Sequence, residues 1–476
     1  MPQAQAAHGQ LGDVCVLGLG KTGTDLALYL SGLGEGRVRS VTLYGGTGSL
    51  EDERRAGLEA SGIRVVLGSE EVEGSYDLAV SSPGISELSG FFRSARAHAR
   101  ECIGEPEFAW RESPQRWLAV TGTNGKTTTT TLATAILREA GLPARSVGNI
   151  GTLATDALQD RATGEWFVAE LSSFQLAGAY RLHPRVACLL NITPDHLEWH
   201  GSLEAYAAAK ERVFQNLEAE DLAIVSCGDP WCQAVRTRLL ARGLRVLALA
   251  EEDHQDPCAA FVREGRMFVR IDGEEQELLG IDELPIKGSH NVQDALAASA
   301  MALELGVGVE AVRRALLAFR SLEHRIEPCG EHAGVRFVND SKATNTDSVE
   351  KALTAFAAGR IVLLLGGHDK GTDLASLSHA VVGRCRAAVC FGEAGERIAL
   401  DLERELGQGG GQLVVARGEH LRDAFSRAVA LACPGDTVLL SPACSSFDEF
   451  GNMAERGRLF KDLVAALSLP EGDERR

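Results

Sequence analysis

The chain has 476 residues, which is too long for a single compact core and predicts about three domains at the usual size of about 150 residues. Hydrophobic residues make up 45% of it and charged residues 24%, as in an ordinary globular protein. The net charge of −18 argues against a general binder of nucleic acid or anionic membranes, because both require a basic face. Small anionic substrates, held by a few local lysines and arginines, remain compatible with it.

Neither the N-terminal residues nor the cysteines indicate export. The first residues, MPQAQAAHGQLGD, contain no basic segment followed by an apolar one, and no apolar run approaches the roughly 20 residues that span a bilayer. The eleven cysteines form no CxxC pair, and Cys227/Cys232 and Cys385/Cys390 lack the usual zinc spacing. We therefore expect reduced, mostly buried thiols in a cytoplasmic protein without membrane or nucleic-acid partners.

Three stretches alternate short β-branched runs with Ala- and Leu-rich helical patterns, which predicts an α/β fold with three domains built on parallel sheets. The first domain is expected over residues 1–104. Its predicted elements are strands at Val14–Leu17, Ser40–Tyr44, Ile63–Leu67 and Leu78–Ser81, a helix over Asp25–Leu33 and the turn Ser82-Pro83-Gly84.

The second domain is expected over residues 105–321. Its predicted elements are strands at Trp117–Val120, Trp166–Leu171 and Val186–Ile192 and helices at Thr128–Ala140, Glu204–Phe214 and Asn291–Leu305. Residues 258–283 contain three short runs separated by Gly turns, which predicts a small antiparallel patch.

The third domain is expected over residues 322–476. Its predicted strands are Val335–Asn339, Ile361–Leu365, Ala388–Phe391, Gln412–Val415 and Thr437–Leu440. The charged tail Leu469–Arg476 is expected to be disordered.

A phosphate-binding loop is the clearest local motif. The string Gly122-Thr123-Asn124-Gly125-Lys126-Thr127-Thr128 follows a predicted strand and opens a predicted helix, as phosphate binding requires. Its glycines let backbone N–H groups approach phosphate oxygens, Lys126 offsets β- and γ-phosphate charge, and the Thr127 hydroxyl suits Mg²⁺. Position 120 is Val where the longer motif has Gly, so the string is the shorter GxxGKT. Together with its strand and helix it predicts a phosphate site.

Polar residues follow the two neighbouring strands. Glu170 ends one predicted strand, and Asp195-His196 comes just past the next, so both should lie beside the loop if the sheet is parallel. A carboxylate there suits Mg²⁺, which prefers oxygen ligands. Taken alone, His196 is better explained as a capping or surface histidine. Lys210, on the predicted helix Glu204–Phe214, taken alone is best explained by a solvated helix face.

A second glycine motif, Gly18-x-Gly20-x-x-Gly23, follows the first strand. It resembles a dinucleotide fingerprint, but the ribose-binding acid expected about 20 residues later is missing, since the strand there ends in Tyr44-Gly45-Gly46. Nicotinamide dinucleotide binding is therefore disfavoured. The loop and the start of its helix could still hold a diphosphate.

With these features in place, the chain resembles the Mur ligase family over nearly its whole length. The strings that carry the resemblance are TGTNGKTT (121–128), GNIG (148–151), ELSSFQL (170–176), NITPDH (191–196), GSHN (288–291), His324-Arg325, NDSKATN (339–345), LLGGHDKG (364–371) and SPACSSFDEF (441–450). NDSKATN and SPACSSFDEF point to the branch that adds D-glutamate, because its relatives typically carry a DYAH-like segment at the first of these.

The resemblance implies an N-terminal Rossmann-like domain that binds UDP through Gly20–Gly23 and the Ser82-Pro83-Gly84 turn. Lys21 and Thr22 would lie next to the uracil and diphosphate, Gly84 would contact the same substrate, and Asn149 would contact its muramoyl part. Tyr44-Gly45-Gly46 differs from the acid-containing version typical of the family.

For the central P-loop domain, the resemblance implies that ATP phosphates and two Mg²⁺ ions are bound. Thr127 and Glu170 would hold the first Mg²⁺ and His196 the second, and Lys210 matches the lysine that the family carbamylates with CO₂ to make a metal ligand. Asn291, Arg325 and Asp340 would contact adenine, the ATP phosphates and ribose.

For the C-terminal, Rossmann-like domain, the resemblance implies a D-glutamate site. Its residues would be Lys342, Thr344, Lys370, Ser446 and Phe447. Cations and hydroxyls are what a bound dicarboxylate needs. Phe447 is bulkier than the family's aliphatic residue, and Met453 replaces an expected aromatic one.

The implied reaction is an ATP-dependent addition of D-glutamate to UDP-N-acetylmuramoyl-L-alanine through an acyl phosphate, in the cytoplasmic part of peptidoglycan synthesis. We expect a monomer with hinges near Glu105 and Leu322. The alternatives are a sister ligase (another Mur or a folylpolyglutamate enzyme) with a different amino acid, a P-loop regulatory ATPase that performs no ligation, and, least favoured, a nicotinamide dehydrogenase.

Overall fold

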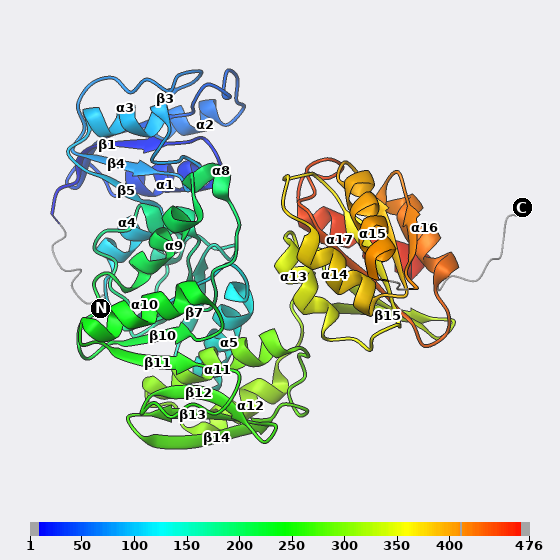
Figure 1. The fold of residues 1–476 in the computed structure, drawn as a ribbon. Helices are drawn as coiled ribbons and strands as arrows, with labels where there is room; N and C mark the ends of the chain where they lie inside the picture. Colours follow the sequence, from blue (N-terminus) through cyan, green and yellow to red (C-terminus); the bar gives the residue numbers. More distant parts are fainter. Residues whose placement is uncertain (1–8, 410–411, 468–476) are drawn as a thin grey trace, which may run out of the picture. The chain divides into compact units, whose positions relative to one another are not determined.

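The structure is a computed structural model that describes residues 9–409 and 412–467 (Figure 1). The predicted disordered tail Leu469–Arg476 lies outside the described residues. The chain forms two compact units, Met1–Leu284 with Gln293–Ala318, and Pro285–Val292 with Phe319–Arg476. None of the described helices combines the length and apolar content that crossing a bilayer requires.

The first sheet is entirely parallel, in the order β3-β2-β1-β4-β5. Its strands are β1 (Gly12–Leu17), β2 (Val38–Tyr44), β3 (Arg64–Val66), β4 (Leu78–Ser81) and β5 (Cys102–Gly104), and its helices are α1 (Lys21–Gly32), α2 (Arg55–Ala60) and α3 (Gly90–His98). Alternate residues of β1 point to opposite faces. Val14 and Val16 pack in one core with Leu26 of α1, whereas Cys15 packs in the other with Phe91 of α3.

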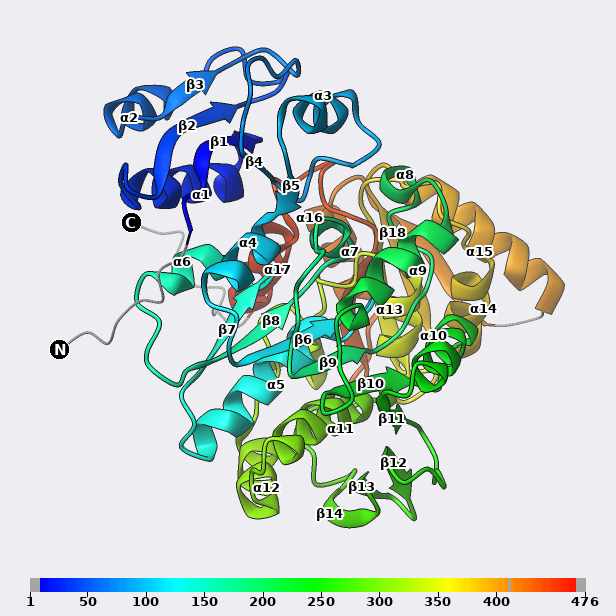
Figure 2. The same ribbon diagram turned by 90° about the vertical axis from the view of Figure 1, so that its left-hand side faces the viewer.

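The second sheet has nine strands in the order β14-β13-β12-β11-β10-β9-β6-β8-β7 (Figure 2). They are β6 (Trp117–Thr121), β7 (Ala144–Gly148), β8 (Trp166–Glu170), β9 (Val186–Leu189), β10 (Leu222–Ser226), β11 (Arg245–Leu249), β12 (Ala259–Arg263), β13 (Arg266–Ile271) and β14 (Glu274–Gly280). The pairs β12–β13 and β13–β14 are antiparallel and the other pairs are parallel, so the predicted antiparallel patch is confirmed.

Helices surround this sheet. They are α4 (Glu105–Glu112), α5 (Lys126–Glu139), α6 (Ala154–Leu158), α7 (Ser173–Ala177), α8 (Leu197–His200), α9 (Leu203–Glu211), the 3-10 helix η1 (Arg212–Phe214), α10 (Pro230–Ala241), α11 (Ser289–Glu304) and α12 (Val309–Ala318). The main core lies against β6, β8, β9 and β10 and includes Phe167, Leu189 and Phe214.

The third sheet has the order β15-β16-β20-β17-β18-β19, and only its β15–β16 pair is antiparallel. Its elements are β15 (Glu327–His332), β16 (Val335–Asn339), β17 (Ile361–Gly366), β18 (Ala387–Phe391), β19 (Val414–Arg417), β20 (Thr437–Ala443), α13 (Thr346–Leu353), α14 (Ala375–Arg384), α15 (Gly395–Gly409), α16 (Leu421–Leu431) and α17 (Met453–Leu467). Separate cores cover its faces: Leu363 packs with residues of α13–α15, and Leu364 with residues of α16 and α17.

The predicted α/β fold with three mostly parallel sheets is confirmed. The sequence pattern makes β3, β8 and β9 too long, and β9 by the most: it ends at Leu189 rather than Ile192, because Asn191 and Ile192 bind loop residues instead of a neighbouring strand. The pattern does not predict strands β5, β7, β10, β11 and β15. The domain boundaries at 104/105 and 321/322 stay predictions.

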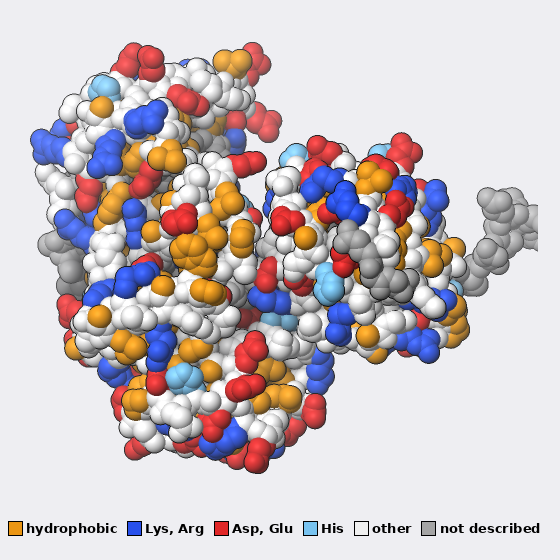
Figure 3. Space-filling view, in the orientation of Figure 1, with side chains coloured by type: hydrophobic (Ala, Val, Ile, Leu, Met, Phe, Trp, Pro, Cys, Tyr) orange, Lys and Arg blue, Asp and Glu red, His pale blue; other side chains and the backbone are white. Residues whose placement is uncertain are grey.

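On the face drawn in Figure 3, acidic and basic side chains are interspersed, and the described side chains there form no broad basic area. Strands β6, β8 and β9 are parallel, so the phosphate loop after β6, Glu170 at the end of β8 and Asn191 after β9 lie at the same end of the second sheet.

Candidate active site

The phosphate loop lies between the end of β6 and the start of α5, as predicted. Gly125 has a φ of 85° and a Cβ there would come within 2.3 Å of Asp294 Oδ1, while Gly122 has a φ of 153° and would bring a Cβ within 3.1 Å of Leu190 Cβ. Both positions therefore require glycine. Thr127 and Thr128 follow in the first turn of α5.

Two lysines from different helices converge on this loop. Lys126 Nζ donates to the carbonyl oxygens of Gly122 and Thr123, both over 2.8 Å, and Lys210 Nζ of α9 donates to the same Gly122 oxygen over 2.7 Å. Lys210 is fully buried, so its side chain does not lie on a solvated helix face. Burial, and then the neighbouring Lys126 charge, hold the pKa of Lys210 well below its usual range.

Asn191 holds the loop from the other side. Its Oδ1 accepts a hydrogen bond from Asn124 N over 2.8 Å, and its Nδ2 donates to Asn124 O over 3.2 Å. Thr123 is held in turn, since its Oγ1 lies 3.0 Å from Tyr206 Oη and accepts from Thr193 N over 3.0 Å. Sequence reasoning assigned no role to Asn191 or Tyr206, although Asn191 opens the NITPDH string and Tyr206 precedes Lys210 by one helical turn.

Glu170 ends β8, next to the loop, as predicted. Its Oε1 accepts a hydrogen bond from Asn149 Nδ2 over 2.8 Å, so the predicted metal ligand and the predicted muramoyl contact lie together. Its other oxygen, Oε2, is buried and has no hydrogen-bond partner among the described residues. Lys126 and Lys210 lie at the same edge of the sheet, and Glu170 is one of the charges that act on Lys210.

The described residues contain no group of three or more His, Cys, Asp or Glu side chains arranged to hold a metal ion. The predicted ligand set does not depend on such a group, since it consists of one hydroxyl, one carboxylate, one imidazole and a modified lysine. An unpartnered buried carboxylate oxygen beside a phosphate loop is suited to a hard cation such as Mg²⁺.

His196 lies on the N-terminal side of α8 in a left-handed conformation, with a φ of 53°. Its ring packs on Phe174, at 4.7 Å between centroids, and its Nε2 lies 3.5 Å from Asp195 Oδ2. Because β9 ends at Leu189, His196 stands on the loop that follows the strand rather than at the strand end itself. It lies at the rim of an aromatic group that also contains Trp199.

The residues predicted to hold UDP lie at the carboxyl ends of the first sheet's strands. Lys21 is the first residue of α1, and its Nζ lies 2.9 Å from Asp25 Oδ2 and 3.7 Å from Asp156 Oδ2. Thr22 follows it in the same turn, and Gly84 lies exposed in the turn after β4. Lys21 is thus turned along α1 toward two carboxylates, of which Asp156 belongs to α6.

In the second unit, Asp340 is buried at the end of β16. Its Oδ2 accepts from Ser441 Oγ over 2.7 Å and its Oδ1 accepts from Ile326 N over 3.3 Å. Burial raises the pKa of Asp340 to about 7, and the Ser441 hydrogen bond, the Ile326 N–H and the Arg325 charge oppose that rise. Arg325 and Asp340, both predicted to bind ATP, therefore lie close together.

The predicted D-glutamate residues come from three segments of this unit. Lys370 Nζ donates to Thr344 O over 3.1 Å, so these two lie together, and Lys342 N donates to His324 O over 3.1 Å. Ser446 is buried, whereas Phe447 next to it is 70% exposed and available to a ligand. Asn291 belongs to the short segment Pro285–Val292 of the same unit, and its Nδ2 donates to Lys287 O over 2.7 Å.

Arg456 of α17 joins two of these segments, and sequence reasoning missed it. Its buried guanidinium donates to Ser341 O and Cys444 O, both over 3.0 Å, and to Ser445 O over 3.2 Å. Burial lowers the pKa of Arg456 to about 10. An arginine on a C-terminal helix ordinarily predicts a solvated face, so the sequence offered no signal for this contact.

A strand, a glycine loop and a helix that presents Lys126, with Lys210 of a second helix and a carboxylate at the neighbouring strand end, define a nucleotide-binding enzyme of the P-loop class. The protein-family model described as "Mur ligase middle domain" matches residues 120–302. The model described as "Mur ligase, glutamate ligase domain" matches residues 324–444.

Whole-chain comparisons agree with these matches. The chain is 40% identical over 459 residues to the UDP-N-acetylmuramoylalanine–D-glutamate ligase of Acidobacterium capsulatum, covering 95% of this chain and 96% of that protein. It is 37% identical over 460 residues to the ligase of the same name from Koribacter versatilis, covering 96% and 98%. The structure of a pseudomurein peptide ligase type C from Methanothermus fervidus shares the fold, with a TM-score of 0.59 at 16% identity over 95% of this chain and 99% of that one. The chain belongs to the Mur ligase family.

Proposed function

We propose that the protein joins D-glutamate to the alanyl carboxylate of UDP-N-acetylmuramoyl-L-alanine at the expense of ATP, in peptidoglycan synthesis. The observation that carries this proposal is the 40% identity, over nearly the whole of both chains, to a relative that bears the name of this activity. The phosphate loop and the buried polar groups around it support the ATP-dependent part.

ATP phosphates would bind at the loop Gly122–Thr128. Lys126 and Lys210 bring their Nζ atoms to one carbonyl oxygen of the loop, and the Lys126 ammonium would donate to bound phosphate oxygens. In the second unit, Arg325 would contact the phosphates, Asp340 the ribose and Asn291 the adenine. These assignments follow the family's pattern residue by residue.

Lys210 would carry a carbamate. A neutral amine attacks CO₂ through its nitrogen lone pair and releases one proton, so the lowered pKa of Lys210 favours the reaction. The carbamate nitrogen keeps one N–H, which can retain the hydrogen bond to Gly122 O. The change places a negative charge beside the Lys126 ammonium, where a protonated Lys210 would be repelled.

Two Mg²⁺ ions would be held by Thr127, Glu170, His196 and the carbamate of Lys210. The unpartnered Oε2 of Glu170 fits such a role, because a buried carboxylate oxygen without a donor is costly unless a cation faces it. Bound Mg²⁺ would offset the negative charge on the transferring phosphoryl group. The protein's part is to orient these oxygens and to fix the loop through Asn191 and Tyr206.

D-glutamate would bind in the second unit. Lys342 and Lys370 supply positive charge for its two carboxylates, and Thr344 and Ser446 supply hydroxyls. Arg456 holds the backbone of Ser341 and of Ser445, which precede Lys342 and Ser446. Exposed Phe447 would contact the ligand's aliphatic part.

The reaction follows from these groups. An oxygen of the alanyl carboxylate attacks the γ-phosphorus of ATP, ADP leaves, and an acyl phosphate forms. The amine of D-glutamate then attacks the acyl carbon, and the tetrahedral intermediate expels phosphate and loses a proton to give the amide.

The test is ADP release, measured with UDP-N-acetylmuramoyl-L-alanine and a panel of amino acids. We expect release with D-glutamate at least about 100-fold faster than with L-glutamate, L-lysine or diaminopimelate, since a site that pairs two carboxylates and places one amine for attack cannot do all three for the other enantiomer or for a different side chain. Activity with L-lysine or diaminopimelate alone would assign a sister ligase. Substrate-stimulated ATP hydrolysis without an amide product would assign a regulatory ATPase.

A further inference from the structure

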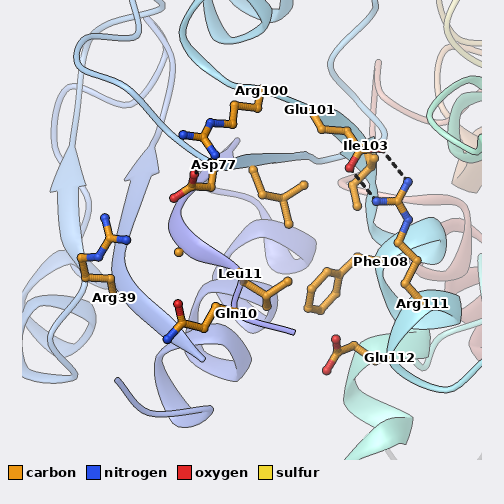
Figure 4. A pocket seen from close by; sticks show the side chains of 12 residues that line it. Gln10, Leu11, Arg39, Asp77, Arg100, Glu101, Ile103, Phe108, Arg111 and Glu112 are labelled. Carbon is orange, nitrogen blue, oxygen red and sulfur yellow. Dashed lines mark hydrogen bonds and ion pairs between the residues drawn. The ribbon is translucent and has the colours of Figure 1, made fainter. Parts of the chain in front are cut away.

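A cavity lies at the N-terminal ends of the first sheet's strands, opposite the C-terminal ends where the proposed UDP residues lie. Its volume is about 470 Å³, within the range of sites for small molecules. Gly12 at the start of β1, Leu78 at the start of β4 and Ile103 of β5 line it, together with Phe108 of α4 (Figure 4). We call it the strand-start pocket. The proposed UDP residues Lys21 and Gly84 lie after the ends of β1 and β4, so the two places are distinct.

The floor of the strand-start pocket is apolar and rigid. Leu78, Ile103 and Phe108 are buried members of the first sheet's core, and Leu11 packs against the same core. The Phe108 ring is itself fixed by an edge-to-face contact with Tyr29, at 6.0 Å between centroids. Because Leu78, Ile103 and Phe108 are themselves almost fully buried, a flat or branched apolar group would contact their outer atoms and the partly exposed Leu11 without rearranging the core.

Every carboxylate at the walls already has partners for both of its oxygens. Glu101 binds both Nη atoms of Arg111, over 2.7 and 2.8 Å, and Glu112 binds both Nη atoms of Arg37, over 2.8 and 2.9 Å. Asp77 accepts from Asp13 N over 3.0 Å through one oxygen and lies 3.1 Å from Arg100 Nη1 through the other. The acidic groups therefore have little capacity left for a cationic ligand.

Two guanidinium groups at the wall have N–H donors that a ligand could use. Within the described chain, Arg39 and Arg100 are each joined to one carboxylate through Nη1, and their side chains are 68% and 83% exposed. A guanidinium carries five N–H donors, so most of those on Arg39 and Arg100 face solvent. In Figure 4 both lie on the strand side of the cavity, away from the Arg111–Glu101 pair.

We propose that the strand-start pocket binds a small organic anion that carries one apolar ring or branched chain. Its carboxylate would take N–H donors from Arg39 and Arg100, and its apolar part would lie on Phe108, Ile103 and Leu78. Such a ligand joins the starts of β1 and β4 to α4, and so stabilises the region where the chain leaves the first sheet.

The probe is 3-phenylpropionate, compared with the neutral 3-phenylpropanol, which has the same ring and chain. Binding to the full chain is measured by calorimetry with saturating UDP present to occupy the proposed nucleotide site. We expect the acid to bind at least about 10-fold more tightly than the alcohol, since only the acid offers charged acceptor oxygens to the guanidinium N–H groups. The double variant Arg39→Gln/Arg100→Gln should lose this difference, while Arg55→Gln, on exposed α2, should retain it.

Three results would overturn the proposal. They are equal affinities for the acid and the alcohol, undiminished binding of the acid by the double variant, and no binding of the acid by the unmodified chain. Both substituted arginines are largely exposed, so the double variant is expected to fold, and its melting temperature checks this.

Discussion

Lys126 and Lys210 share one acceptor: the Nζ atoms of both donate to the carbonyl oxygen of Gly122, over 2.8 and 2.7 Å. Like charges at such close range repel each other strongly when one is buried. Burial is the larger cause of the lowered pKa of Lys210, and the Lys126 charge adds to it. Because Lys210 is the fully buried one of the two, it is the lysine that we propose for reaction with CO₂.

Replacing Lys126 by Ala should abolish ATP turnover and leave the fold intact. Its ammonium donates to the carbonyls of Gly122 and Thr123, and Gly122 O keeps the hydrogen bond from Lys210 once the side chain is gone. We expect kcat/KM for phosphate release to fall about 100-fold or more. Lys351→Ala, on α13, is the matched control and should keep its activity. A Lys126→Ala enzyme with normal turnover would show that the loop does not hold ATP.

Replacing Lys210 by Met preserves the volume of the buried side chain but removes the amine that would bind CO₂. Ligation should fall about 100-fold or more, since a metal ligand is lost. Enzyme incubated with ¹³C-labelled bicarbonate should give a carbamate carbon signal in the NMR spectrum, and the Lys210→Met enzyme should not. Full activity of Lys210→Met, or the same signal in both proteins, would contradict the assignment.

Asp340→Asn should change how stability depends on pH. The folded pKa of Asp340, about 7, lies above the ordinary 3.8, so between these values the folded chain binds more protons than the unfolded chain. The unfolding free energy of the unmodified protein should therefore fall, relative to that of the variant, as pH rises from about 4 to about 7, by at most about 1.4 kcal/mol per pH unit. Urea unfolding at several pH values measures this. Parallel pH profiles would show that Asp340 titrates normally.

Arg456→Met should destabilise the second unit. It leaves the backbone carbonyl oxygens of Ser341 and Cys444 without their buried donor, while Ser445 O keeps the hydrogen bond from His368 N, and we expect a cost of about 2 kcal/mol or more. The urea midpoint of this unit reports the loss. Arg458→Met, on the exposed side of the same helix, should leave the midpoint unchanged. Equal midpoints for both variants would show that the buried contacts contribute nothing.

Contiguous motifs were the part of the site that sequence could predict. The loop from Gly122 to Thr128 could be predicted because a strand pattern precedes it and a helix pattern follows it. Glu170 could be predicted because it stands at the end of a strand pattern. Asn191 was missed because its contact with Asn124 depends on where β9 stops. The burial of Lys210 depends on which face of α9 packs inward. In the run AYAAAK only Tyr206, one turn before Lys210, marks that face, and a single aromatic residue did not decide it.

Longer-range relationships in the second unit had no sequence signal. The Thr344–Lys370 hydrogen bond joins residues 26 positions apart, and the contacts of Arg456 span up to 115 positions. They arise because β16, β17 and β20 lie side by side, which brings the segments after their ends together. Sheet order, rather than local pattern, therefore decides which of the predicted D-glutamate residues meet.

In the proposed reaction, the alanyl carboxylate is activated by transfer of the ATP γ-phosphoryl group before D-glutamate attacks it. The most direct measurement uses UDP-N-acetylmuramoyl-L-alanine labelled with ¹⁸O in both carboxylate oxygens, followed by mass spectrometry of phosphate and product. If an acyl phosphate forms, each inorganic phosphate should contain one ¹⁸O, and the new amide carbonyl should contain the other, with D-glutamate incorporated in the product. Phosphate without ¹⁸O, or a product lacking D-glutamate, would contradict it.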